Sequence, residues 1–153
     1  MSNKLPIRLR PAIQEDVNFL FSSWLKSYRN SHFSRFIDNT VYYSEHHKLI
    51  ERLVKENKVI VACNENDPNQ LYGYICAGRV DNFLVIHYIY VKHSFRNLGI
   101  GKQLINSFDH DPSVAGIYTH HTKIADRLAP RYNLVFHPYL MFGESSDEQK
   151  DEE

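Results

Sequence analysis

The residues best suited to chemistry in this chain are two glycines, Gly99 and Gly101, with Arg96 before them and Lys102 after them. Glycine lets a backbone turn tightly and come close to a ligand, and the first amides of a helix have no carbonyl partner within that helix. Free amides, the helix dipole and the two side-chain charges all favour an anion. The segment therefore predicts a phosphate-binding turn.

Two common phosphate-binding motifs do not fit this spacing. A Walker loop places a glycine five positions before the glycine of its GK[ST] end, whereas this chain has Arg96 there and Gln103 after Lys102. A dinucleotide fingerprint needs a third glycine three positions after Gly101, where this chain has Leu104. A glycine-rich turn between a strand and a helix, without any ligand, is the structural alternative.

The elements on either side must position this turn. Residues 83–91 form an apolar run rich in β-branched and aromatic side chains, which predicts a buried strand, and an amphipathic helix follows the turn and ends near His110. Residues 114–119 predict another strand, and the helical connection makes it parallel to the first.

The other elements follow from periodicity and turn composition. Two adjacent histidines near the start of the second helix do not share a helix face, so we expect them to be solvated and not to bind a metal. The expected elements are strand 7–10, a helix through residues 17–28, helix 44–57 with His46 and His47 near its start, hairpin strands 58–63 and 71–80, short helix 122–128 stopped by Pro130, and a last strand or hairpin in 134–142.

Length and cysteine content limit the class of protein. At 153 residues the chain fits one domain, which we expect to span residues 1–143. Cys63 and Cys76 lack the spacing of a metal or redox motif, so we expect reduced thiols. The start of the sequence lacks an apolar signal-peptide core, and no apolar run approaches membrane-spanning length. We therefore expect a cytoplasmic protein without a metal or a membrane contact.

The charge is balanced overall but unevenly distributed. Of 18 basic and 18 acidic residues, residues 144–153 hold six acids and one base, which leaves 17 bases, 12 acids and a net charge of +5 elsewhere. A mildly basic body suits a polyanionic ligand. The acidic residues 144–153 predict a solvated, disordered tail.

The turn and its flanks resemble the acyl-CoA loop of the GNAT N-acetyltransferase superfamily, which reads Arg or Gln, two residues, Gly, one residue, then Gly or Ala. The matching residues are Arg96, Asn97-Leu98, Gly99, Ile100 and Gly101, after the strand end Ile89-Tyr90-Val91. The order of elements over residues 7–142 is similar to the family as well. The resemblance implies an α/β fold with a mixed sheet of about six or seven strands, about four flanking helices, and a splayed wedge between the fourth and fifth strands.

The resemblance also implies acetyl-CoA as co-substrate. In such proteins the diphosphate meets the amides of the turn, the pantetheine arm pairs with the preceding strand, and an amide near Val91, where the strand kinks, stabilises the oxyanion. The implied cofactor-binding residues are Ile89, Tyr90, Val91, Arg96, Asn97, Leu98, Gly99, Ile100, Gly101 and Lys102.

Acyl transfer to an amine also needs proton carriers. His87, four residues before Val91, is the first candidate for the general base, and a core histidine bonded to a neighbour is the alternative. The family often carries a tyrosine as the acid where this chain has Ala129. The substitutes are Tyr132, three residues on, and Tyr118, His120 and His121 near the end of strand 114–119.

Two functions of different class follow from the resemblance. The first is an N-acetyltransferase that moves an acetyl group from acetyl-CoA to a primary amine of a small molecule or protein. The second is a GNAT-like domain that binds CoA as a regulatory or interaction module, with weak or no catalysis, which Ala129 favours. No basic helix or RNP-type pattern predicts nucleic-acid binding. Members of the family often form homodimers, but the sequence does not indicate the oligomeric state. The resemblance implies that residues 28–43 lie on the acceptor side, and a surface loop held by its aromatic side chains is the alternative.

Overall fold

The computed structural model describes residues 5–141, and within them the predicted fold class is confirmed: a mixed sheet of six strands with four α-helices. The elements in chain order are β1 (Ile7–Pro11), α1 (Val17–Arg29), α2 (Asn39–Glu56), β2 (Lys58–Asn64), β3 (Asp67–Val80), β4 (Phe83–Val91), α3 (Ile100–Asn106), β5 (Gly116–Tyr118), α4 (Lys123–Tyr132) and β6 (Leu134–Phe136).

The strands lie in the order β1-β2-β3-β4-β5-β6, antiparallel up to β4 and parallel from β4 to β6. Strands β4 and β5 pair over only two positions, Val85 with Ile117 and Ile86 with Tyr118. Residues 88–91 of β4 pair with β3 on one side and have no β5 partner on the other. The carboxyl end of β4 therefore borders the wedge that the sequence predicts.

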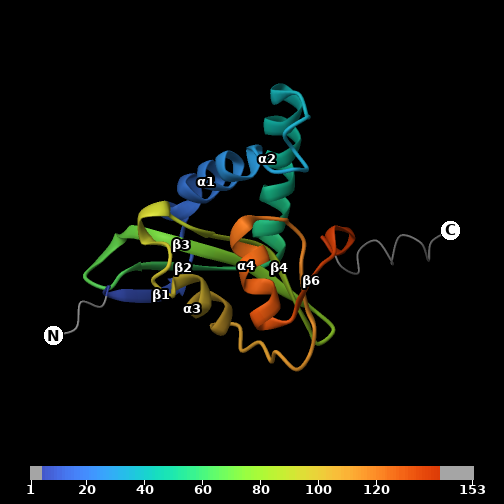
Figure 1. The fold of residues 1–153 in the computed structure, drawn as a ribbon. Helices are drawn as coiled ribbons and strands as arrows, with labels where there is room; N and C mark the ends of the chain where they lie inside the picture. Colours follow the sequence, from blue (N-terminus) through green and yellow to red (C-terminus); the bar gives the residue numbers. More distant parts are fainter. Residues whose placement is uncertain (1–4, 142–153) are drawn as a thin grey trace.

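The helices cover both faces of the sheet (Figure 1): α1 and α2 lie on one face, and α3 and α4 on the other. Each pair encloses its own core. Successive side chains of β4 point to opposite faces of the sheet and so enter different cores. Ile89 packs with Leu104 and Ala129 below α3 and α4, whereas Tyr88 packs with Trp24 below α1 and α2. Strand β4 therefore supplies side chains to both faces of the sheet next to the wedge.

A β-bulge interrupts β4 at His87. Cys76 of β3 lies opposite Tyr88 and the next residue, Ala77, lies opposite Ile86, so His87 is the extra residue. The sequence prediction of a kink near Val91 differs from this position, since Val91 still pairs in register with β3. The bulge lies next to Ile86, the last residue of β4 that pairs with β5.

Helix α2 begins at Asn39, five residues before the predicted start at Ser44. Asp38 is its N-cap, and the Asp38 carboxylate accepts a hydrogen bond from the Thr40 amide at 3.0 Å. His46 lies on the buried face of α2, four residues after Tyr42, and its ring stacks between those of Tyr28 and Tyr42 with centroids 5.2 Å away in each case. The expectation that His46 is solvated was wrong, because its side chain is buried.

Helix α4 also extends beyond its predicted end. It continues through Pro130 to Tyr132, and Asn133 ends it in the left-handed conformation while donating its amide to the Ala129 carbonyl. Ala125, Ala129 and Tyr132 form its buried face. Packing of that face offsets the loss of the backbone hydrogen bond that Pro130 cannot donate.

The expected acidic tail, residues 144–153, lies outside the described residues. Within residues 5–141, no helix has both the length and the apolar character that crossing a bilayer requires.

Candidate active site

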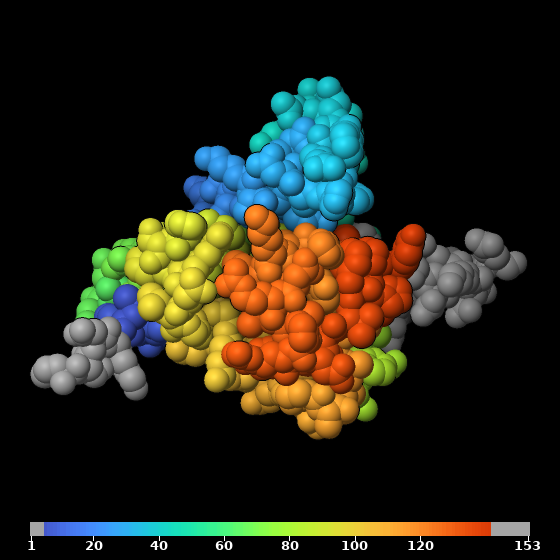
Figure 2. All heavy atoms as spheres, in the orientation of Figure 1, coloured from blue at the N-terminus to red at the C-terminus, as the bar shows by residue number. Residues whose placement is uncertain are grey.

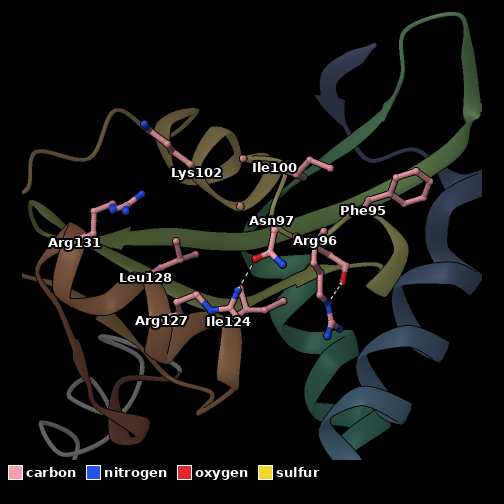
Figure 3. Close-up of a pocket in the computed structure, with 12 residues that line it drawn as sticks. Phe95, Arg96, Asn97, Ile100, Lys102, Ile124, Arg127, Leu128 and Arg131 are labelled. Carbon is pink, nitrogen blue, oxygen red and sulfur yellow. Dashed lines mark hydrogen bonds between the residues drawn. The ribbon is translucent and has the colours of Figure 1, made fainter. Parts of the chain in front are cut away.

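The glycine turn forms one wall of a cavity of about 290 Å³. The other walls are the end of β4 and the α4 residues Ile124, Arg127, Leu128 and Arg131. Figure 3 shows the side chains of the turn facing those of α4 across this space, and in Figure 2 the two segments lie side by side on the same face of the molecule. We call this space the turn cavity.

The backbone of the turn requires its small residues. Gly99 is the N-cap of α3 with φ of 83°, and Asn97 also has a positive φ of 65°. A Cβ on Gly101 would lie 3.3 Å from the Leu128 side chain, so this glycine lets α3 approach α4. Gln103 donates its amide to the Gly99 carbonyl at 3.1 Å, and the amides before Gln103 precede the helix's own ladder.

Four basic side chains line the turn cavity. Two of them are tied to neighbours: the Arg96 Nε donates to the Val91 carbonyl at 2.9 Å, and the Arg127 Nη1 donates to the Asn97 Oδ1 at 3.1 Å. Lys102 and Arg131 complete the set, from α3 and α4 respectively. The wall is therefore positively charged and suited to a polyanion.

Most of the predicted cofactor residues lie at this cavity. Those that line it are Val91, Arg96, Asn97, Gly99, Ile100, Gly101 and Lys102, whereas Ile89, Tyr90 and Leu98 do not. Ile89 is buried beneath α3, Tyr90 packs toward α1, and Leu98 points outward with 52% of its surface exposed. The cofactor-binding role of the whole set stays a prediction.

Sequence reasoning missed Arg127 and Arg131. Their spacing of four residues puts them on one side of a helix, together with the apolar pair Ile124 and Leu128. That pattern is present in the sequence, but the helix predicted over residues 122–128 excluded Arg131.

A second cavity of about 500 Å³ lies on the opposite face, beside α1 and α2. We call it the aromatic cavity. It is lined by Tyr28, His32 and Phe33 at the end of α1, by His46 and Leu49 of α2, by Thr119, His120 and His121 after β5, and by Phe136, Pro138, Tyr139 and Met141. The segment after β5 thus borders both the wedge and this cavity.

A chain of buried polar side chains runs inward from the aromatic cavity. His46 Nε2 and His120 Nε2 are 3.3 Å apart, His120 Nδ1 and the Thr119 hydroxyl 3.2 Å, and that hydroxyl and His87 Nδ1 3.0 Å. Each neutral imidazole donates from one nitrogen and accepts at the other, so the chain is satisfied in either direction. His87 therefore reaches the cavity only through Thr119 and His120.

Burial keeps these histidines uncharged. It lowers the pKa of His87 and of His46 to about 4 in each case. Burial, together with the neighbouring His46 and His87, also holds the pKa of His120 well below its usual range. His87 is 3% exposed, in a bulge and bonded to Thr119, which matches the alternative of a core histidine; its role as general base stays a prediction.

Tyr118 and His121 meet at one carboxylate. The Tyr118 hydroxyl donates to Asp126 Oδ1 at 3.0 Å, and His121 Nε2 lies 3.2 Å from Asp126 Oδ2. Burial and the adjacent Asp126 raise the pKa of Tyr118 to about 12, so it is a weak proton donor at neutral pH. The His121 side chain is 49% exposed and lines the aromatic cavity, so it is the more accessible proton carrier.

Tyr132 lies apart from this group. It occupies the last position of α4, buried in the core on the α3 side, and its carbonyl is 2.7 Å from His110 Nε2. His110 follows α3, and Gly116 at the start of β5 donates its amide to Asn133. Tyr132 is therefore near the start of β5, whereas the wedge is at its end.

Sulfur and metal chemistry find little support in the described residues. Cys63 and Cys76 are both free and buried. Residues 5–141 hold no group of three or more His, Cys, Asp or Glu side chains arranged to bind a metal ion.

Several solved structures share the fold. A candidate acetyltransferase from Clostridium difficile 630 is 20% identical, with a TM-score of 0.53 and 82% of this chain and 86% of that chain covered. A candidate acetyl transferase from Pyrococcus furiosus is 22% identical, with a TM-score of 0.50 and coverage of 95% and 90%. The chain spans 63% of the apo form of YjaB from Escherichia coli, with 66% of this chain covered, 22% identity and a TM-score of 0.48.

No curated protein sequence matches the chain. The sequence model of the Acetyltransferase (GNAT) family matches residues 18–110, which include α1 from its second residue, α2, strands β2 to β4, the glycine turn and α3. With the fold, the wedge and the turn in place, this chain belongs to the GNAT acetyltransferase family.

Proposed function

We propose that the protein transfers an acetyl group from acetyl-CoA to a primary amine of a small molecule or protein. The observation that carries the proposal is the turn cavity: in a chain of this family, it joins free helix amides, four basic side chains and the unpaired end of β4. In the reaction the amine nitrogen attacks the thioester carbonyl carbon, a C–N bond forms and the C–S bond breaks. The nitrogen loses one proton, and the departing sulfur of CoA gains one to form the thiol.

Acetyl-CoA fits the two ends of this site. The amides and basic side chains of the turn cavity suit the diphosphate, because hydrogen bonds from charged donors to phosphate are among the stronger ones in proteins. The backbone of residues 89–91 suits the pantetheine arm, since one edge of β4 has no strand partner there. An extended arm along that edge brings the thioester into the wedge.

His121 is the most accessible of the five proton-carrier candidates. It lines the aromatic cavity at the end of β5, and Asp126 holds its ring. A carboxylate in that position orients an imidazole and stabilises the cation that proton uptake creates. We infer that the acceptor amine enters through the aromatic cavity and gives its proton to His121.

The direct test is acetyl-CoA binding by calorimetry, followed by thiol release with a panel of amines. Arg131→Ala removes a charged donor from the turn cavity and should weaken acetyl-CoA binding by about tenfold. Lys123→Ala is the matched control, because Lys123 is an exposed base on the same helix that does not line the cavity. It should bind acetyl-CoA like the unmodified protein.

A CoA-binding module without catalysis is the second candidate. Ala129, which stands where the family often has a tyrosine, is packed in the core with no polar group to offer. Tight acetyl-CoA binding with no thiol release for any amine would favour the module. Absence of binding, with Arg131→Ala and Lys123→Ala indistinguishable, would remove both candidates.

The cellular location remains an expectation. Two buried, unpaired cysteines are what a reducing compartment permits, and they support a cytoplasmic location.

A further inference from the structure

The aromatic cavity offers rings where an acceptor would bind. Tyr28 and Phe33 face each other with centroids 6.2 Å apart, and Phe136 packs edge-on to His121 at 5.2 Å. Leu49 adds an aliphatic wall. Rings at these distances accommodate another aromatic group through offset or edge contacts.

Within residues 5–141, the lining of this cavity holds no carboxylate to pair with a cation. Among the described residues that line it, none is an Asp or a Glu. Asp126 contacts the lining residue His121, but one of its oxygens already accepts from the Tyr118 hydroxyl at 3.0 Å and the other lies 3.2 Å from His121. An ammonium group in the cavity would meet no free carboxylate among these side chains.

The inner wall is polar but neutral. His46 and His120 are 5% and 2% exposed, and they use their facing nitrogens on each other. A cation that leaves water without a partner loses hydration that a neutral imidazole does not replace. Cation–π attraction to the rings recovers only part of that loss.

We propose that the aromatic cavity selects an aromatic amine that is uncharged at neutral pH, an arylamine, over an alkylammonium of the same size. This inference rests on the proposed acetyl transfer. The lone pair of such an amine is free to attack the thioester without prior loss of a proton. The nitrogen releases its proton only after the C–N bond forms, and CoA departs as the thiol.

Two isomers separate the alternatives. 4-Methylaniline and benzylamine have the same atoms, but at pH 7 the first is neutral and the second is protonated like other alkylamines. Calorimetry with saturating CoA, which carries no acetyl group, compares their binding without turnover. Thiol release with acetyl-CoA then compares kcat/KM. We expect 4-methylaniline to be preferred by at least about tenfold in both measurements.

A charge introduced into the cavity should reverse the preference. Phe33 lines the cavity and is 64% exposed, so Phe33→Glu places a carboxylate there with little effect on folding. It should strengthen benzylamine binding about tenfold relative to 4-methylaniline, because the new charge attracts the ammonium. Phe36→Glu is the matched control, three residues along the same segment, 83% exposed and outside the lining. It should leave the ratio unchanged.

Equal or tighter binding of benzylamine to the unmodified protein would overturn the inference, as would binding of neither isomer. The same shift in both variants would overturn it too, because the effect would then come from general surface charge. Failure to bind acetyl-CoA would instead refute the proposed function. In that case, calorimetry of the two amines without CoA would still measure the selectivity of the cavity.

Discussion

The three buried histidines make the stability of the protein depend on pH. His46 and His87 have a pKa near 4 in the folded chain because they are buried, against about 6.5 when unfolded. Between these values the unfolded chain binds more protons than the folded one. The stabilisation from neutral burial is therefore complete above about pH 6.5 and is lost as the pH falls toward 4, by about 1.4 kcal/mol per pH unit for each histidine.

We expect the urea midpoint of unfolding to decrease as the pH is lowered from 6.5 to 4.5. In His46→Gln the midpoint should depend less steeply on pH. His47→Gln is the control, because the neighbouring His47 is exposed and should leave the slope unchanged. A second loss at lower pH comes from Asp16, whose pKa is lowered by its hydrogen bonds to Arg10 and the Ile13 amide despite burial. A flat stability curve down to pH 4.5 would mean that the histidines gain protons in the folded chain.

His121 should matter for turnover and not for cofactor binding. His121→Gln removes the proton carrier and should lower kcat by about 10²-fold, with little change in KM for acetyl-CoA. Asp126→Asn keeps the size of the side chain but weakens the orientation of the ring, so we expect a smaller loss. Steady-state kinetics with acetyl-CoA and an accepted amine measures both losses.

His32→Gln serves as the comparison for this pair, because His32 is an exposed histidine that lines the same cavity. It should retain its kcat. If His121→Gln behaved like His32→Gln, another group would have to carry the proton.

At the scale of elements, the N-cap of α4 fixes the helix that carries Arg127 and Arg131. The Thr122 hydroxyl accepts from the Ala125 amide at 3.1 Å. Thr122→Ala leaves this amide without its cap and should lower the free energy of unfolding by about 1 kcal/mol, measured from urea midpoints. Thr122→Ser retains the hydroxyl and should restore most of it.

Thr40→Ala tests whether that loss is specific to the cap. The Thr40 backbone amide, and not its side chain, takes part in the cap of α2. This substitution should have little effect on stability. An equal loss for both alanine variants would indicate that side-chain packing, and not capping, sets the value.

The sequence predicts those elements whose signal is local. The apolar run at residues 83–91 has the bounds of β4 as observed, and the glycine turn follows from residue type alone. The bulge at His87 depends on register against β3, which one strand's sequence does not contain. His46 packs against Tyr42 of the same helix and Tyr28 of α1. The predicted start at Ser44 excluded Tyr42 from the helix, and the contact with Tyr28 is tertiary.

The same distinction applies to the candidate site. Residues of the turn could be predicted because they are contiguous, and glycine and basic residues mark them. Arg131 was missed because packing of Tyr132 carries α4 past Pro130, against the usual effect of proline. Tyr118 and His121 share Asp126 only because β5 ends where α4 begins, and that geometry is tertiary.

At the scale of the whole molecule, the sheet separates two cavities of opposite character. The turn cavity, on the α3 and α4 face, carries four basic side chains, whereas the aromatic cavity, on the α1 and α2 face, is lined by rings and by the buried, neutral His46 and His120. The wedge between β4 and β5, where residues 88–91 of β4 have no β5 partner, lies between these two faces. A polyanionic donor and an uncharged acceptor could then approach one reaction centre from opposite faces without competing for charge.

This separation predicts two different responses to salt. Raising KCl from 0.1 M to 1 M shortens the Debye length from about 10 Å to about 3 Å. Acetyl-CoA binding, which depends on attraction to Lys102 and Arg131, should then weaken by about tenfold. Binding of 4-methylaniline should change by less than about twofold, because it involves no charge. Calorimetric titration of each ligand at both salt concentrations measures the contrast, and a parallel weakening of the two would mean that the acceptor cavity also binds through charge.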